Sequence, residues 1–210
     1  MDSECMPLKE VRKTEEEEVT AAFGYKTINW ITKEMLGKLY SQLSNEERKY
    51  IQESLKRIKS EFELGKLMAK NPIEKAIATY LNRDEEGKLV MRTKDVPSYR
   101  KKLNELMAEH ALGLFDVKTR EFLSNLYFGE TYSKLSENKL NELGLKLYGV
   151  LNAAGPGYGS TAEEKKTLSM FIKKDETTGL YTIPAADQQT LKEWVAAMAT
   201  KKLKAVPKKV

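Results

Sequence analysis

The chain has 210 residues, of which 40% are hydrophobic and 32% are charged, and its formal net charge is +5. This length and composition permit a folded core and exclude disorder of the whole chain. No apolar run reaches the roughly 20 residues of a membrane span, and the N-terminus lacks the pattern of a secretory signal, so we expect neither a membrane protein nor a secreted one. A single cysteine, Cys5, excludes a disulfide framework.

Charge is distributed unevenly along the chain. Residues 1–20 carry seven acidic and three basic side chains, whereas residues 201–210 carry five lysines and no acid. Such opposed ends are typical of charged arms on a body of mixed charge. We therefore expect an acidic N-terminal arm over residues 1–20, a helical body over residues 21–200 and a basic C-terminal tail over residues 201–210, with mobile ends.

Apolar residues recur at helical spacing in the first half of the chain. Ser44 and Glu47 have the spacing of a capping box, which predicts a helix that continues to about Lys70. Asn71 and Pro72 predict the cap and the first turn of the next helix. The apolar stripe of the first of these helices consists of residues spaced by three or four: Ile51, Leu55, Ile58, Phe62, Gly65 and Ala69. Basic residues off this stripe are expected to face solvent or a partner: Lys56, Arg57, Lys59 and Lys66.

Capping residues also mark helices in the second half. His110, the only histidine, falls on the apolar side of the helix that follows Pro97, so we expect it to be packed within the fold. Eight or nine helices follow from these patterns, and the predicted fold class is all-α, in one compact multi-helix domain. The expected starts of the later helices lie at or near Asp95, Asp116, Ser136, Ser160 and Asp187.

Two short segments interrupt the helical pattern. The turns at residues 83–87 and 174–179 are acidic and end in glycine, and each leads into a short β-prone run. They predict two β-hairpin-like connectors, each followed by a proline and then by a helix. An internal duplication would explain this resemblance, but the two segments share few identities, so we interpret them as convergent connectors.

The sequence offers little for catalysis. One histidine and one cysteine cannot supply the usual four ligands of a zinc site, and Cys5 has no fixed partner that would activate its thiol. We therefore expect no enzymatic activity, no cofactor and no metal. The glycine-rich segment 155–161 suits the approach of an anion, but it lacks the lysine and the preceding strand of a P-loop. We interpret this segment as a turn, with contact to a nucleic-acid backbone as the alternative.

Basic residues stand beside aromatic ones at residues 48–50 and 99–102. A groove for single-stranded nucleic acid needs cations for the phosphates and flat rings for the bases. These two segments supply both groups, and the lysine tail adds further cations. The residues expected to bind nucleic acid are Arg48, Lys49, Tyr99, Arg100, Lys101, Lys102, Tyr158, Lys201, Lys202, Lys204, Lys208 and Lys209.

These patterns favour a non-enzymatic structural protein that self-assembles and packages nucleic acid without strong sequence specificity, as viral coat and nucleocapsid proteins do. We expect a homo-oligomer that prefers single-stranded RNA to DNA and is found in a virion or in the host cytoplasm, away from membranes. The alternative is an intracellular helical adaptor whose apolar stripe from Ile51 to Phe62 receives a partner helix.

Overall fold

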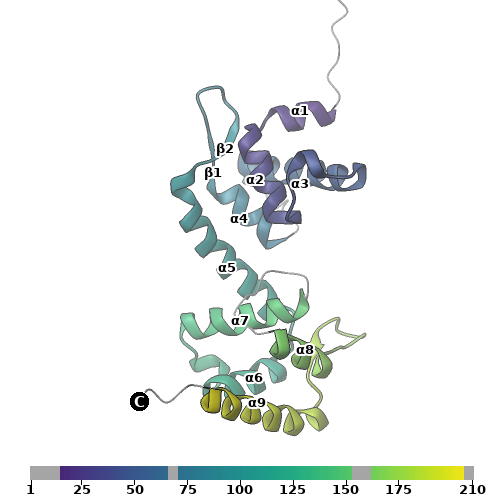
Figure 1. Cartoon of the computed structure of the whole chain (residues 1–210), viewed down its shortest axis with the longest axis vertical. Helices are drawn as coiled ribbons and strands as arrows, with labels where there is room; N and C mark the ends of the chain where they lie inside the picture. The colour runs from purple at the N-terminus through teal and green to yellow at the C-terminus, as the bar shows by residue number, and fades with distance from the viewer. Residues whose placement is uncertain (1–14, 66–70, 153–161, 206–210) are drawn as a thin grey trace, which may run out of the picture. The chain divides into compact units, whose positions relative to one another are not determined.

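The computed structural model describes residues 15–65, 71–152 and 162–205 (Figure 1). These residues contain nine α-helices and two small antiparallel hairpins, which confirms the predicted all-α class. The chain divides into two compact units, Met1–Lys102 and Leu103–Val210.

The first unit is built around four helices and one hairpin. Its hairpin pairs Leu81 with Met91 and Arg83 with Leu89. Helix α5 (Val96–Gly113) begins in this unit and continues into the second. The elements are α1 (Glu15–Ala21), α2 (Tyr25–Leu36), the 3-10 helix η1 (Tyr40–Gln42), α3 (Asn45–Leu64), α4 (Pro72–Tyr80), β1 (Leu81–Arg83), β2 (Leu89–Met91), the 3-10 helix η2 (Thr93–Asp95) and α5 (Val96–Gly113).

The second unit has the same order of elements. Its short hairpin pairs Lys173 with Thr182 and Lys174 with Tyr181. The elements that follow α5 are α6 (Val117–Phe128), the 3-10 helix η3 (Tyr132–Lys134), α7 (Glu137–Leu151), α8 (Ala162–Phe171), β3 (Lys173–Lys174), β4 (Tyr181–Thr182) and α9 (Ala185–Ala205).

Side-chain caps begin the helices as their sequences predict. Ser44, Asn71, Asp116 and Ser136 each accept a hydrogen bond from the backbone N–H three residues later. The predicted end of α3 near residue 70 was wrong, because Gly65 takes the left-handed conformation, with φ 59°, and stops the helix. Periodicity alone had extended the apolar stripe past this C-cap.

The two units repeat one backbone plan at an offset of 92 residues. In the first unit an isolated parallel bridge joins Phe23 to Leu89, and in the second the same kind of bridge joins Phe115 to Tyr181. Phe23 and Phe115 are 92 positions apart, as are Leu89 and Tyr181. All four side chains belong to the interior or its edge, so the bridge ties the loop before α2 or α6 to the hairpin of the same unit.

A side-chain hydrogen bond repeats at the same offset. The Thr27 hydroxyl accepts from the backbone N–H of Met91 at 3.1 Å, and the Thr119 hydroxyl accepts from the N–H of Ile183 at 2.9 Å. Helices α2 and α6 then end 92 residues apart, each at a left-handed glycine, Gly37 or Gly129.

The offset shifts by one residue at the hairpin turn. Asp84 and Asp175, the first turn residues, are 91 positions apart, because the second turn has one residue more. Each aspartate accepts hydrogen bonds from two backbone N–H groups of its own turn. The correspondence therefore covers the whole unit, and we interpret the hairpins as parts of a tandem repeat in place of the convergent connectors predicted from the sequence.

Helix α5 joins the two repeats. Its last seven residues, 107–113, lie 92 positions after α1, and η2 with α5 together lie 92 positions before α9. One continuous helix thus closes the first repeat and opens the second. Helix α9 has the same length as η2 plus α5, so it runs seven residues beyond the end of the second repeat.

Candidate functional site

The expected nucleic-acid residues on α3 lie at the surface. Arg48 and Lys49 are exposed, and the Tyr50 side chain beside them is 44% exposed. The Arg48 guanidinium lies 6.0 Å from the centre of the Tyr40 ring. This segment of α3 therefore presents cations and an accessible aromatic ring together.

The prediction that Tyr99 stacks on a base was wrong. Tyr99 is fully buried, its ring packs edge-on against Trp30 at 4.8 Å, and its hydroxyl donates to Glu34 at 3.2 Å. The same position of the second repeat holds Leu191, which is also fully buried. Tyr99 is a core residue of the joining helix, where α5 packs on the first unit.

The basic residues after Tyr99 have mixed surroundings. Arg100 is exposed, but its guanidinium pairs with the Glu34 carboxylate at 2.5 Å, so its charge is shared within the unit. Lys101 is exposed and Lys102 is half-buried. The structure therefore places at most part of this segment in a position to meet a polyanion.

Several predicted residues fall in or near the termini and the glycine-rich segment. Tyr158, Lys208, Lys209 and all of the segment 155–161 lie outside the described residues. The remaining tail residues, Lys201, Lys202 and Lys204, belong to α9, since this helix continues to Ala205.

His110 is exposed, which contradicts the prediction that it is packed. The buried face of α5 advances in steps of four, through Leu103, Met107 and Ala111. Glu109 and His110 lie between the buried pairs Met107–Ala108 and Ala111–Leu112, and both are exposed.

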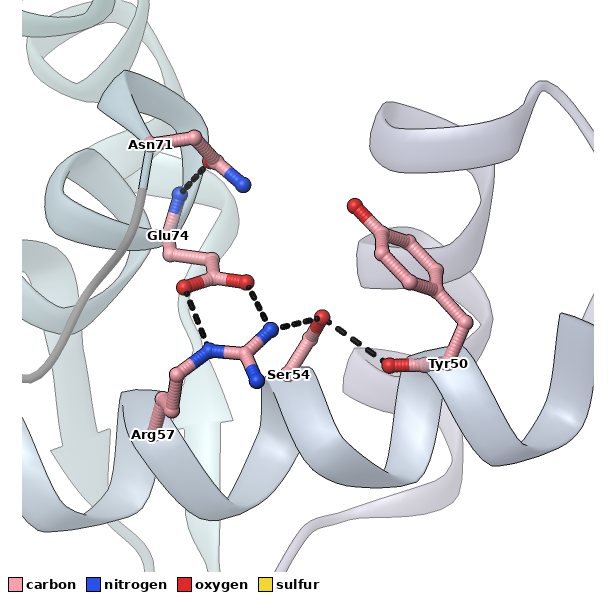
Figure 2. Close-up of polar contacts among 5 residues, drawn as sticks. All are labelled: Tyr50, Ser54, Arg57, Asn71 and Glu74. Atoms are coloured by element: carbon pink, nitrogen blue, oxygen red, sulfur yellow. Dashed lines mark hydrogen bonds and ion pairs between the residues drawn. The ribbon is translucent and has the colours of Figure 1, made fainter.

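Arg57, expected to face solvent or a partner, instead forms an ion pair with the fully buried Glu74 (Figure 2). The pair is bidentate, with Nε–Oε2 at 3.0 Å and Nη2–Oε1 at 2.7 Å. The hydrogen bond to Glu74 raises the pKa of Arg57 further above its usual value. A bidentate pair of this kind is the geometry that arginine forms best with a carboxylate.

Neighbouring groups complete this cluster. Ser54 accepts from Arg57 at 3.0 Å and donates to the Tyr50 carbonyl at 3.0 Å, while Asn71 caps the Glu74 N–H at 2.9 Å. In Figure 2 the Tyr50 carbonyl, and not its ring, is joined to this cluster by a dashed line. The cluster thus joins α3 to α4 through satisfied hydrogen bonds, which is a structural role. The sequence signal was a glutamate just after a helix start, which reads as a simple first-turn acid.

The stripe assigned to a partner helix is part of the first core. Ile51, Leu55 and Ile58 are each 0% exposed. These three residues of the stripe are therefore covered by their own unit, while Phe62 at its end is half-buried.

The second unit contains a cavity of about 220 Å³ between four helices. Polar groups line it from α6, α7 and α8, and α9 lines it with the apolar side chains of Trp194, Val195 and Met198. Its polar centre is the ion pair of Lys146 and Glu164, whose Nζ and Oε1 lie 3.4 Å apart. Its lining consists of Tyr127, Glu142, Lys146, Glu164, Trp194, Val195 and Met198.

Burial is unequal among the cavity's polar groups. The Lys146 and Glu164 side chains are each 12% exposed, whereas Glu142 lies at the surface. The Tyr127 hydroxyl is buried near Glu164 without a standard hydrogen bond to it. Burial, and then the negative charge of Glu164, raise the pKa of Tyr127 well above its usual value. Tyr127 is therefore a neutral hydroxyl at physiological pH.

Other kinds of site are absent from the part of the chain that the structure describes. It contains no group of three or more histidine, cysteine, aspartate or glutamate side chains placed to hold a metal ion. Across residues 15–65, 71–152 and 162–205, no helix is both long and apolar enough to cross a membrane. No protein-family model, curated protein sequence or solved structure matches this chain.

Proposed function

We propose that this chain is a non-enzymatic structural protein whose copies associate head to tail through the two ends of its tandem repeat. The supporting observation is that two helical segments, one near each end of the chain, hold the same position in the repeat but carry opposite charges. Helix α1 and residues 199–205 of α9 occupy the same position of the repeat, 184 residues apart. Residues 15–18 are four glutamates, whereas Lys201, Lys202 and Lys204 lie in the α9 segment.

The internal junction supports this proposal. Residues 107–113 of α5 hold the same repeat position inside the chain, and there the helix packs closely on its own unit: Ala111 is fully buried, and Ala108 approaches α7 at Gly144. Repeat proteins gain stability from each interface between neighbouring repeats. A basic last helix against an acidic first helix would extend that series from one copy to the next, and heterologous contacts of this kind form chains or rings.

The test is a charge exchange. We expect light scattering to show association that weakens as salt is raised, because surface charges are screened over about 8 Å at physiological ionic strength. Replacing Lys201, Lys202 and Lys204 with glutamate should abolish association, and so should replacing Glu16, Glu17 and Glu18 with lysine. Mixing the two variants should restore mixed assemblies. A control variant with Lys26, Lys118 and Lys166 changed to glutamate has the same net charge as the first and should still associate.

Two results would overturn the proposal. One is a wild-type chain that stays monomeric at low salt and high concentration. The other is association that the control variant loses as completely as the variant of Lys201, Lys202 and Lys204, since only net charge would then matter.

A second candidate function is sequence-tolerant binding of single-stranded nucleic acid, which the exposed group of Arg48, Lys49 and Tyr50 on α3 favours. Each phosphate contact contributes about 0.7 to the slope of log affinity against log salt. Replacing Arg48 and Lys49 with glutamine should therefore reduce this slope by about 1.4 and weaken binding of unrelated RNA sequences alike. Absence of any anisotropy change with RNA or DNA at low salt, for monomer and assembly, would exclude this function.

A further inference from the structure

We propose that the two repeats are kept from exchanging their closing helices with a second copy of the chain, because equivalent positions make contacts of different chemistry in the two units. The closing segments are residues 93–113, which comprise η2 and α5, and α9, and they have the same length and the same place in the repeat. Tandem repeats with one backbone plan are prone to exchange such elements between copies. The proposal does not depend on head-to-tail association, since exchange requires a helix to leave its own unit.

In the first unit, polar groups fix the closing helix. The Tyr99 hydroxyl donates to the Glu34 carboxylate at 3.2 Å, and the Arg100 guanidinium pairs with the other carboxylate oxygen at 2.5 Å. The Glu34 side chain is only 11% exposed, and the buried Tyr99 ring packs edge-on against Trp30. These hydrogen bonds join residues 65 and 66 positions apart, so they form only when the correct helix docks on α2.

In the second unit, the equivalent positions are apolar. Leu126 and Leu191 lie 92 positions after Glu34 and Tyr99, and both belong to the core of this unit. Placing α5 there would set the Tyr99 hydroxyl beside Leu126 in place of its carboxylate acceptor, and would force a larger side chain into the fully buried site of Leu191. Placing α9 on the first unit would remove the hydroxyl donor of Glu34 and leave space beside Trp30 unfilled. Both exchanges therefore carry a penalty that the native pairing avoids.

A second contact has its charges reversed between the units. Lys38 pairs with Glu47 at 2.6 Å in the first unit, and Glu130 pairs with Lys139 in the second. Lys38 and Glu130 are 92 positions apart, as are Glu47 and Lys139. A second helix docked on the third helix of the other unit would therefore place like charges together. Because all four side chains reach solvent, this contact discriminates less than the buried one.

Refolding of the full chain tests the proposal. The protein is unfolded in urea, refolded at high protein concentration and then diluted into high salt, which dissociates assemblies held by surface charge. Dimers with exchanged helices persist, because their separation requires a helix to leave its unit. Glu34→Leu with Tyr99→Leu gives the first unit the apolar contact of the second. We expect size-exclusion chromatography with light scattering to show about tenfold more persistent dimer than for the unmodified chain.

A matched control separates lost discrimination from lost stability. Glu34→Gln with Tyr99→Phe removes the same charge and the same hydroxyl but keeps the aromatic volume, so its dimer fraction should stay within about twofold of that of the unmodified chain. Equal dimer formation by the control and the leucine variant would contradict the proposal, because loss of stability would then be sufficient for exchange.

A surface variant guards against a folding defect in the leucine variant. Lys38→Glu with Glu47→Lys keeps an ion pair in the first unit but gives both units the same charge order, and should form about threefold more persistent dimer. Adding Glu130→Lys and Lys139→Glu restores the opposed order and should return the dimer fraction to its original value. The proposal fails if neither the leucine variant nor this charge variant forms more dimer than the unmodified chain.

Discussion

The first and second units have the same backbone plan but few identical residues. The residues that they share explain how two different sequences form this plan. Thr27 and Thr119 bond the hairpin, Gly37 and Gly129 end a helix, and Ser44 and Ser136 begin the next one. Core positions differ in type but keep their burial, as where Tyr99 is matched by Leu191. Groups that direct or satisfy the backbone therefore define this repeat, while the core requires only suitable volume.

The units differ most between their third and fourth helices. The first has the buried bidentate pair of Arg57 and Glu74, whereas the second has the longer pair of Lys146 and Glu164 beside a cavity. Gly149 occupies the repeat position of Arg57 and leaves no side chain there. One repeat thus has an ion pair at this position, and the other has a buried glycine.

The largest expected effect is on that ion pair. Arg57→Met leaves the Glu74 charge buried without its partner and should lower the free energy of unfolding by about 3–5 kcal/mol. Lys146→Met should cost about 1–2 kcal/mol, because its pair is longer and its carboxylate is less completely buried than Glu74. Urea unfolding measures both, with Trp30 reporting on the first unit and Trp194 on the second. Equal losses would show that the two pairs are equivalent after all.

A glycine contact should give the next largest difference. A Cβ on Gly144 would lie 2.5 Å from the Ala108 carbonyl oxygen and 2.6 Å from its Cα, so α5 and α7 must separate in Gly144→Ala. We expect a loss of about 2–3 kcal/mol from this overpacking. Gln52→Ala changes the same repeat position in the first unit and should cost less than about 1 kcal/mol. Chemical denaturation that ranks the two variants in the opposite order would contradict the close crossing.

The two threonine bonds should respond alike. Thr27→Val and Thr119→Val keep the side-chain shape but leave the N–H of Met91 or Ile183 without its acceptor, at a cost of about 1–2 kcal/mol each. The loss should be larger for Thr119, whose bond is fully buried. Serine at either position retains the hydroxyl and should recover most of the stability. If neither valine variant changes the melting temperature, these bonds do not hold the hairpins.

The smallest expected effect is a pH dependence in the second hairpin. Backbone N–H groups of Thr178 and Thr177 lower the pKa of Asp175 below its usual 3.8. The stabilising contribution is therefore complete above the ordinary pKa and disappears as pH falls through the lower pKa of the folded state. NMR titration of the Asp175 carboxyl carbon should show this lowered midpoint, and Asp175→Asn should remove the corresponding part of the acid sensitivity. A midpoint at or above 3.8 would contradict the turn geometry.

Local chemistry predicted most of the helix starts and both hairpins. A cap at Asn71 or Asp116 acts within three residues, so its effect can be read from a short stretch of sequence. The repeat itself was missed, because its shared residues are few and far apart. Its evidence is a set of hydrogen bonds between residues about 64 positions apart, such as Thr27 with Met91, and sequence alone does not pair them.

The exposure of individual side chains was predicted less accurately than the helix starts, for a physical reason. Tyr99 and His110 lie on α5, a helix that contributes to both units, and their exposure depends on which face each unit covers. Periodicity gives the spacing of a buried stripe, but it does not decide whether His110 or Ala111 is buried one turn after Leu106 and Met107. The exposed position of Arg48 and Lys49 agrees with the polar surroundings of their sequence, while the partner of Arg57 came from a different helix.

The offset of 92 residues also has a mechanical consequence. Because α5 belongs to both repeats, a chain pulled at its two ends would unfold in two steps of similar length, one for each repeat. At 3.3–3.6 Å per residue, 92 residues correspond to a contour length of roughly 300–330 Å. The second unit, which lacks the buried pair of Arg57 and Glu74, would unfold first, so this ion pair would set the order of the two steps.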